Sequence, residues 1–294
     1  MNIREALRSA AERLELHHVS NARLTAELLL AHSLSVEREY LYAHDNRLLR
    51  EDESRALQGL LHDRISGVPL QYIVGRQEFY GRYFHVTPAV LIPRPETEYI
   101  VEAVLEIRGQ TLFSATQENL GLAPNFQAAS PRILDVGTGS GCIAVTLALE
   151  IPGAQVFAGD ISEAALQVAR ENAVSLGATV GFVCMDVLDA FSGRFDFIVS
   201  NPPYVRPGDN SRLQREVREH EPHVALFSPE DELAIYRRLI AGAEGLLEPG
   251  GHLLMEVGIG MDERVSELFK ATWEKLETKT DLQGIPRTVI AKLL

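Results

Sequence analysis

Cysteine and tryptophan are scarce in this sequence, and long apolar runs are missing. Two cysteines and one tryptophan occur among 294 residues, which excludes a disulfide-stapled secreted scaffold. Cys142 and Cys184 stand in apolar surroundings, so we expect buried thiols without a redox role. No apolar segment reaches the roughly 18 residues of a membrane span. Near the N-terminus Glu5, Glu12 and Glu15 alternate with arginines, against a signal or transit peptide. We therefore expect a soluble, cytoplasmic protein that does not contact a membrane.

Basic residues are in the minority. Lys and Arg number 28 against 41 Asp and Glu, which gives a net charge of −13, and nearly all of the acidic excess follows Arg76. A chain of this sign lacks the basic footprint of a duplex-DNA binder, so we expect no DNA partner, although a local basic groove stays open. The 46% hydrophobic and 23% charged residues are ordinary for a globular protein. The length allows more than one domain.

Helical periodicity dominates the first 76 residues. Apolar residues recur at helical spacing in 2–16 and 22–34, and 45–67 continues the pattern. These residues predict a small all-helical domain over 1–76. Histidines are scattered in this region, and the later pair in the segment HEPH has no third ligand nearby, so we expect no metal site.

The pattern changes after the helical domain. Aromatic and β-branched residues around Gly81 predict a β-hairpin over 77–92, which links the helical domain to a second domain over 93–294. Pro95 suits the first turn of a helix. Residues 109–131 show little periodicity and are expected to form a long, mobile surface loop.

Strands and helices alternate from Arg132 onward, which predicts an α/β fold with a parallel, doubly wound sheet. Ligands bind beyond the carboxyl ends of the strands in such sheets, so the residues at those ends are the candidates for a site. Expected strands cover 132–136, 154–160, 180–186, 195–200, 248–260 and 288–294, and expected helices cover 142–150, 162–177 and 263–276.

A glycine-rich turn follows the first of these strands and consists of Gly137, Thr138, Gly139, Ser140 and Gly141. Its glycines let the backbone turn sharply and approach a ligand without a side chain in the way. A nicotinamide dinucleotide fingerprint needs a further glycine where Cys142 stands. The spacing after Asp135 fits better the turn in which methyltransferases hold the amino-acid end of S-adenosylmethionine. A dinucleotide binder and a merely tight turn stay open as alternatives.

Acidic residues end the next two strands. Asp160 lies about 20 residues beyond the glycine turn, where a carboxylate can accept hydrogen bonds from both hydroxyls of a ribose. This position indicates a ribose-bearing cofactor. The following strand ends at Asp186 and Val187, which we expect beside an adenine.

The fourth strand stops at Asn201-Pro202-Pro203-Tyr204, because a proline lacks an N–H and cannot continue a strand. The carboxamide of Asn201 and the carbonyl of Pro202 are two acceptors that together can hold a planar NH₂ group, such as an amide or a base amine. Tyr204 is expected to form an apolar wall. In the competing interpretation this is a proline-rich loop in which Asn201 caps a turn and Tyr204 only packs.

Four segments together resemble a known family. In this order, and behind a helical domain, they resemble the glutamine methyltransferases that modify peptide-chain release factors: GRQEFYGRYFHVTPAVLIPRPETE, ILDVGTGSG, FDFIVSNPPYV and EPHVAL. The resemblance runs from about Leu24 to Arg287. It implies a Rossmann-like class I S-adenosylmethionine-dependent methyltransferase sheet, S-adenosylmethionine as cofactor, and the glutamine of the Gly-Gly-Gln motif of a release factor as substrate. It also implies that the helical domain grips the release factor.

Carried over by position, the resemblance assigns roles to single residues. Residues 137–141 hold the methionine end of the cofactor, Asp160 its ribose and Val187 its adenine region. Residues 201–204 hold the substrate amide, with Asn201 and Pro202 as the catalytic pair and Asn201 also beside the cofactor. The family often has a large or aromatic residue where Val187 stands, so we expect looser adenine packing.

Two other functions compete with this one. NPPY is shared with adenine-N6 methyltransferases, which grip a base amine with the same acceptors and must flip the base. A non-catalytic cofactor-binding module is the second alternative, and it predicts binding without turnover.

Overall fold

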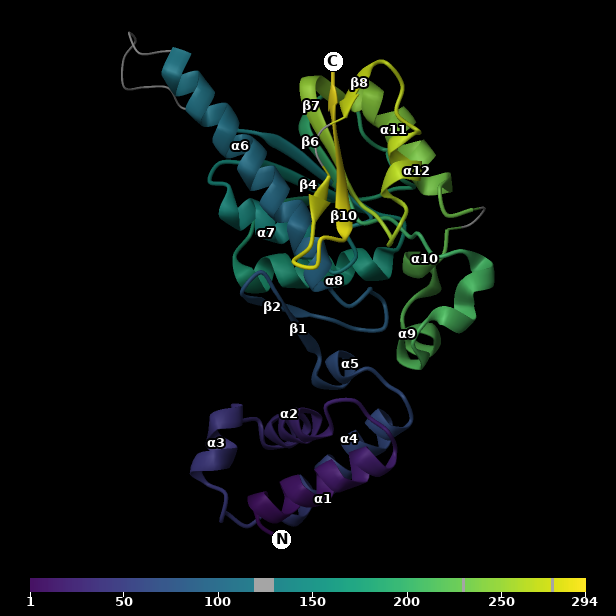
Figure 1. Ribbon diagram of the computed structural model, residues 1–294. Helices are drawn as coiled ribbons and strands as arrows, with labels where there is room; N and C mark the ends of the chain where they lie inside the picture. Colours follow the sequence, from purple (N-terminus) through teal and green to yellow (C-terminus); the bar gives the residue numbers. More distant parts are fainter. Residues whose placement is uncertain (119–129, 229–230, 276–277) are drawn as a thin grey trace. The chain divides into compact units, whose positions relative to one another are not determined.

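The structure of the chain is a computed structural model that describes residues 1–118, 130–228, 231–275 and 278–294. It divides into two compact units (Figure 1). The first comprises Met1–Arg76 and Leu213–His220, and the second comprises Gln77–Arg212 and Glu221–Leu294. In the part of the chain that is described, no helix is both long enough and apolar enough to cross a lipid bilayer.

The first unit is helical. Its elements are α1 (Ile3–Leu16), α2 (Ala22–Leu34), α3 (Arg38–Ala43), α4 (Glu51–Ile65), α5 (Leu70–Val74) and α9 (Arg215–His220). Asn2 begins α1 with a reciprocal cap, since its side chain accepts from the Glu5 N–H at 2.8 Å and the Glu5 carboxylate accepts from the Asn2 N–H at 3.0 Å. The core is apolar and includes Leu7, Leu14, Leu29, Leu30, Leu57 and Leu61.

A segment distant in the sequence belongs to the helical unit. The second domain expected over 93–294 includes 213–220, whereas the structure groups this segment with residues 1–76. Polar contacts explain the grouping: Arg64 pairs with Glu216 at 2.7 Å, and Arg215 donates to the Ser66 carbonyl at 3.2 Å. Contacts of this kind leave no periodic signal in a sequence.

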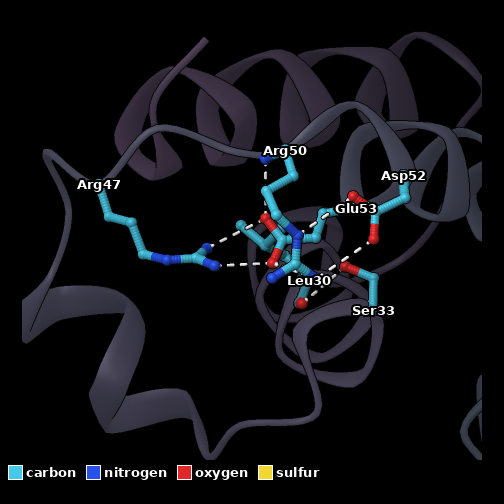
Figure 2. Close-up of polar contacts among 6 residues, drawn as sticks. All are labelled: Leu30, Ser33, Arg47, Arg50, Asp52 and Glu53. Atoms are coloured by element: carbon cyan, nitrogen blue, oxygen red, sulfur yellow. Dashed lines mark hydrogen bonds and ion pairs between the residues drawn. The ribbon is translucent and has the colours of Figure 1, made fainter.

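The helix expected over 45–67 is shorter than the sequence predicts, because Glu53 sets its first residue. Figure 2 shows that the Glu53 carboxylate accepts from the Arg50 N–H at 2.8 Å and from the Arg47 guanidinium at 2.6 and 3.2 Å. The Arg50 guanidinium bonds to Asp52. Glu53 is 5% exposed, and its hydrogen bond with Arg47 holds the pKa of this carboxyl below its ordinary value. The backbone before residue 51 therefore leaves the helical path.

The second unit is built on a mixed sheet. The strand order is β5-β4-β3-β6-β7-β10-β8, with β9 paired to β10. Neighbours from β5 to β7 are parallel, while β10 runs antiparallel to β7, β8 and β9. The strands are β3 (Arg132–Val136), β4 (Gln155–Asp160), β5 (Val180–Cys184), β6 (Phe195–Ser200), β7 (Leu247–Glu256), β8 (Trp273–Lys275), β9 (Lys279–Thr280) and β10 (Pro286–Leu293).

The predicted parallel pairing is therefore confirmed from β5 to β7 and is wrong for β10, which runs antiparallel. The helix expected over 263–276 is also wrong: α12 covers only Asp262–Ser266, and Trp273–Lys275 form β8. An antiparallel neighbour needs no helical crossover, so β8 and β9 can lead back to β10 through short turns. Thr272 and Trp273 favour a strand.

Helices cover both faces of the sheet, as a doubly wound fold requires (Figure 1). On one face, residues of α11 and α12 are buried with those of β6, β7 and β10. On the other, residues of the β1–β2 hairpin, α6, α7 and α8 share a second apolar core. The bounds of these elements, and of the short helices η1, η2 and α10, are β1 (Arg76–Phe79), β2 (Arg82–His85), η1 (Pro95–Thr97), α6 (Glu98–Glu118), α7 (Cys142–Glu150), α8 (Glu163–Leu176), η2 (Pro207–Arg212), α10 (His223–Leu226), α11 (Ala234–Leu246) and α12 (Asp262–Ser266).

Two local expectations differ from the structure. Residues 109–118 are helical in α6 rather than part of a loop: no proline interrupts them, and the one glycine costs only about 1 kcal/mol. The rest of the expected loop, 119–129, lies outside the described residues. Cys142 is buried as expected, but Cys184 is exposed, because it ends β5 at the edge of the sheet.

The first prediction concerns Glu53. Replacing it by Gln removes a charged acceptor from three donors, and we expect the free energy of opening of the helical unit to fall by about 1.5–3 kcal/mol. Hydrogen exchange on peptides from α1 and α2 measures this quantity in the intact chain. Since the pKa of Glu53 is lowered, its contribution is present above the ordinary carboxyl value of 4.5 and is lost as the pH falls through the folded-state pKa.

Asp52→Asn is the matched control. Asp52 is exposed and, among the described residues, its carboxylate pairs with Arg50 alone, and such surface pairs contribute little. Equal exchange in the two variants would contradict a structural role for Glu53.

Candidate functional site

A cavity of about 550 Å³ opens at the carboxyl ends of β3, β4, β5 and β6. It lies where the strand order reverses between β3 and β6, the usual ligand position in open α/β sheets. Its volume falls in the range of small-molecule sites, about 300–1,000 Å³. The strand ends contribute Val136, Gly137, Thr138, Gly139, Ser140, Asp160, Met185, Asp186, Val187, Ser200, Asn201, Pro202 and Pro203 to its lining.

Most of the residues singled out in the sequence line this cavity together. Gly141 and Tyr204 are the two that do not. A Cβ added to Gly258 would come within 3.0 Å of the Tyr204 ring, and that ring packs against the apolar core. Burial raises the pKa of the Tyr204 hydroxyl to about 12. These contacts favour packing for Tyr204, and its contact with a substrate stays a prediction.

The glycine turn is hydrogen-bonded to the end of the neighbouring strand β4. The N–H groups of Gly137 and Thr138 donate to the Gly159 carbonyl at 2.8 and 3.0 Å. The Thr138 hydroxyl donates to buried Asp135 at 2.6 Å, and burial raises the pKa of this carboxyl to about 7. The turn is thereby fixed before any ligand arrives.

The three glycines have positive φ, at +72° for Gly137, +54° for Gly139 and +81° for Gly141. A Cβ added at either of the first two would meet no atom within 4 Å, so both open onto free space. A Cβ at Gly141 would lie 3.1 Å from that of Ala169 in α8. Gly141 therefore allows close packing of two helices, while the other two leave room for a ligand.

Asp160 supports the turn and keeps acceptor capacity. One carboxylate oxygen accepts from the Gly139 N–H and the other from the Ser162 N–H, both at 2.9 Å. Each oxygen has a second lone pair, and the side chain lines the cavity. Burial raises the pKa of Asp160, although the backbone hydrogen bonds oppose that shift. Two hydroxyl groups of a ligand fit the remaining lone pairs.

Val187 lines the same cavity in an unusual conformation. Its φ is +58°, a left-handed value that is rare for a β-branched residue and costs roughly 1–2 kcal/mol. The side chain packs against the apolar core. The position that the sequence places beside an adenine is therefore held by a strained backbone.

Asn201 is oriented by residues that sequence reasoning missed. Its Nδ2 donates to the Thr97 hydroxyl at 3.1 Å, and that hydroxyl bonds to Glu256 at 2.6 Å. The Oδ1 of Asn201 is thus the atom left for a ligand. Thr97 and Glu256 are 2% and 3% exposed, and burial raises the pKa of Glu256 to about 7. Thr97 lies in the segment that ends IPRPETE, but no sequence pattern connects Thr97 or Glu256 with Asn201.

A second contact that sequence reasoning missed lies at the wall of the cavity, where Arg94 is a lining residue. Arg94 pairs with buried Glu221 at 2.5 Å, and the other Glu221 oxygen accepts from the Ile92 N–H at 3.2 Å. This ties the segment before η1 to the segment before α10. Arg94 stands between Pro93 and Pro95 in the sequence, and the start of the following helix does not by itself require an arginine there.

The chain is similar to known proteins over nearly its whole length. Residues 5–75 match the PrmC N-terminal domain, and residues 111–219 match the methyltransferase small domain. A release factor glutamine methyltransferase of Koribacter versatilis is 45% identical over 99% of this chain and 99% of its own length. One of Bradyrhizobium diazoefficiens is 40% identical over 99% of this chain and 95% of its own.

A solved structure supports the fold alone. The catalytic domain of hMettl16 superposes with a TM-score of 0.50 at 16% identity and covers 79% of this chain and 81% of its own. With the methyltransferase domain match, this confirms the predicted Rossmann-like, class I methyltransferase sheet.

The second prediction separates the glycines. Gly141→Ala places a left-handed alanine against Ala169, so we expect a loss of stability greater than the roughly 1–2 kcal/mol of the conformation alone. Gly139→Ala carries only the conformational cost. Denaturation followed by the fluorescence of Trp273, the single tryptophan and buried in the second unit, compares them. Equal stability of the two variants would remove the packing role of Gly141.

Proposed function

The chain belongs to the family of release factor glutamine methyltransferases, and on this premise we propose that it methylates the glutamine of the Gly-Gly-Gln motif of a peptide-chain release factor. The methyl group comes from S-adenosylmethionine and the acceptor is the side-chain amide nitrogen. Family membership, predicted from the four sequence segments, is confirmed by the relatives that match nearly end to end.

The observation that carries the proposal is the orientation of Asn201. Because Nδ2 is engaged by Thr97, Asn201 presents an acceptor to the cavity, and the Pro202 carbonyl supplies the second acceptor from the adjoining residue. Two acceptors suit an NH₂ group that has two hydrogens to donate. A glutamine amide meets this requirement.

The residues of the cavity fit S-adenosylmethionine. The open space above Gly137 and Gly139 accepts an amino-acid end against bare backbone, and the lone pairs of Asp160 accept two ribose hydroxyls. Val187 then lies at the adenine end. When bound, this cofactor supplies an electrophilic methyl group on a sulfonium.

The chain contributes positioning and charge stabilisation. An amide nitrogen is a weak nucleophile because its lone pair is delocalised into the carbonyl. Asn201 Oδ1 and the Pro202 carbonyl accept its two N–H bonds, which raises electron density on the nitrogen and aims it. As the N–C bond forms and the C–S bond of the sulfonium breaks, the nitrogen would gain positive charge, so these acceptors stabilise the transition state more than the ground state. This transfer would leave a neutral thioether from the cofactor, and one of the two amide protons would pass to solvent.

We infer that the helical unit docks the release factor. The cavity is lined by residues of the second unit only, and the match to the PrmC N-terminal domain covers the helical residues. A macromolecular substrate needs more surface than the cavity offers. We place the reaction in the cytoplasm, because both cysteines are free and a reducing compartment keeps them so.

The third prediction tests the function directly. Incubation with methyl-labelled S-adenosylmethionine should label an intact release factor, but neither duplex DNA nor a release factor whose motif glutamine is replaced by alanine. Asn201→Ala should lower turnover by about 10²-fold or more, the scale for one preorganised contact, with a much smaller loss of cofactor affinity.

Asn210→Ala, at an exposed asparagine outside the cavity, is the control. Label in DNA would favour the adenine-N6 alternative, and cofactor binding without any transfer would favour the non-catalytic one. A folded Asn201→Ala enzyme with parental turnover would show that Asn201 is a loop residue.

The fourth prediction concerns the cofactor. Asp160→Ala should weaken S-adenosylmethionine binding by roughly 1.5–3 kcal/mol, the contribution of hydrogen bonds to a charged group, as measured by titration calorimetry. Asp189→Ala, at an exposed acid outside the cavity, should bind like the parent. Unchanged affinity in a folded Asp160→Ala protein takes Asp160 out of the site.

A further inference from the structure

Three side chains from three separate elements form one hydrogen-bonded chain behind the cavity. Asn201 follows β6, Thr97 lies in η1 and Glu256 ends β7. The Thr97 hydroxyl is the middle member, 3.1 Å from Asn201 Nδ2 and 2.6 Å from Glu256 Oε2. Thr97 and Glu256 are both buried. The chain therefore connects a carboxyl group shielded from solvent to the carboxamide that faces the cavity.

The direction of this chain follows from donor and acceptor counts. An ionised carboxylate only accepts, so the single hydrogen of Thr97 must point to Glu256. The Thr97 oxygen can then only accept from Asn201, which must turn its NH₂ toward Thr97 and its Oδ1 toward the cavity. A protonated Glu256 can donate instead. The Thr97 hydrogen is then free to point at Asn201, whose carboxamide can reverse and turn its NH₂ to the cavity.

We propose that Thr97 and Glu256 are positioning residues that set which end of the Asn201 carboxamide meets the substrate, and that protonation of Glu256 allows the carboxamide to reverse. The inference rests on the proposed function, because it matters only if the substrate group is a donor. If the NH₂ group of Asn201 faces the cavity, it cannot form a hydrogen bond with the NH₂ group of a glutamine amide, since neither group can accept. The acceptor orientation is thus enforced only while Glu256 is ionised.

The surroundings of Glu256 place its titration in the working range. Burial raises its pKa to about 7, and the hydrogen bond from Thr97 opposes the shift. Glu96 also raises the pKa, while Arg287 and Arg94 lower it. The Tyr236 hydroxyl donates to the Glu256 main-chain carbonyl at 2.8 Å and not to the carboxyl group. The Tyr204 hydroxyl and the Cys142 thiol also interact with Glu256, and burial raises the pKa of each to about 12.

The fifth prediction therefore measures turnover against pH. With saturating cofactor and release factor, kcat of the parent should rise with pH through a midpoint near 7. Glutamine at position 256 does not titrate in this pH range, and its neutral carboxamide can either accept from or donate to Thr97. We expect Glu256→Gln to show a flat profile between about pH 6 and 9, with kcat below the parent at high pH because a neutral acceptor orients Thr97 less strongly. Saturation removes the effect of any group that acts through cofactor affinity.

Thr97 variants test the middle of the chain. Thr97→Val keeps the shape and removes the hydroxyl, so kcat should fall about tenfold or more, while cofactor affinity stays within about twofold. Thr97→Ser restores the hydroxyl and should recover most of the loss. Thr146→Val is the matched control: Thr146 is fully buried in α7 and its hydroxyl has no partner among the described residues. This control should retain parental kcat.

A measurement without substrate separates this inference from the proposed function. In protein labelled with ¹⁵N at asparagine, the side-chain NH₂ signal of Asn201 should shift with pH through a midpoint near 7, and both Thr97→Val and Glu256→Gln should abolish the shift. An Asn201 signal that does not change with pH, an acid limb that persists in Glu256→Gln, or parental kcat in Thr97→Val overturns the role of this chain of side chains. A parent enzyme that shows the shift but transfers no label to release factor refutes the proposed function alone.

Discussion

The in-register pairing of β3 with β6 is the constraint on which the site depends. Val136 lies opposite Ser200 in this parallel pair, and the Ser200 hydroxyl donates to the Val136 carbonyl at 2.7 Å. The glycine turn begins directly after Val136, and Asn201 directly follows Ser200. Because the two strands end at the same level, the glycine turn and Asn201, which lie 64 residues apart, open onto one cavity.

Buried carboxyl groups occur in both units, and their partners decide what each can do. Glu53 is held by the Arg47 guanidinium, which keeps its pKa low and its charge fixed. Glu256 has a hydroxyl partner in Thr97, which does not offset burial, so its pKa rises to about 7. The first carboxylate fixes the start of α4 and stays ionised. The second can gain or lose a proton near neutral pH, which suits a residue that sets the direction of a hydrogen-bonded chain.

The sequence interpretations that were wrong share a cause. The helix runs through 109–118 because weak local periodicity does not prevent helix formation where no residue ends it. Strand β8 replaces part of an expected helix because Trp273–Lys275 pair with β10, a contact across the chain. Cys184 is exposed because β5 lies at the sheet edge. Each outcome depends on neighbours in space, and local pattern does not contain them.

The sequence by itself determined the helical pattern of residues 1–76 and the alternation of strands and helices after Arg132, because both follow from hydrophobic periodicity. It also determined which residues stand at the strand ends from Gly137 to Pro203, because glycine and proline limit where a strand can continue. It also determined the family. Only the tertiary structure decided that Thr97 and Glu256 stand behind Asn201 and that β10 is antiparallel. The reason is physical: a hydrogen bond between side chains 159 residues apart, as between Thr97 and Glu256, is a product of packing and leaves no periodic trace along the chain.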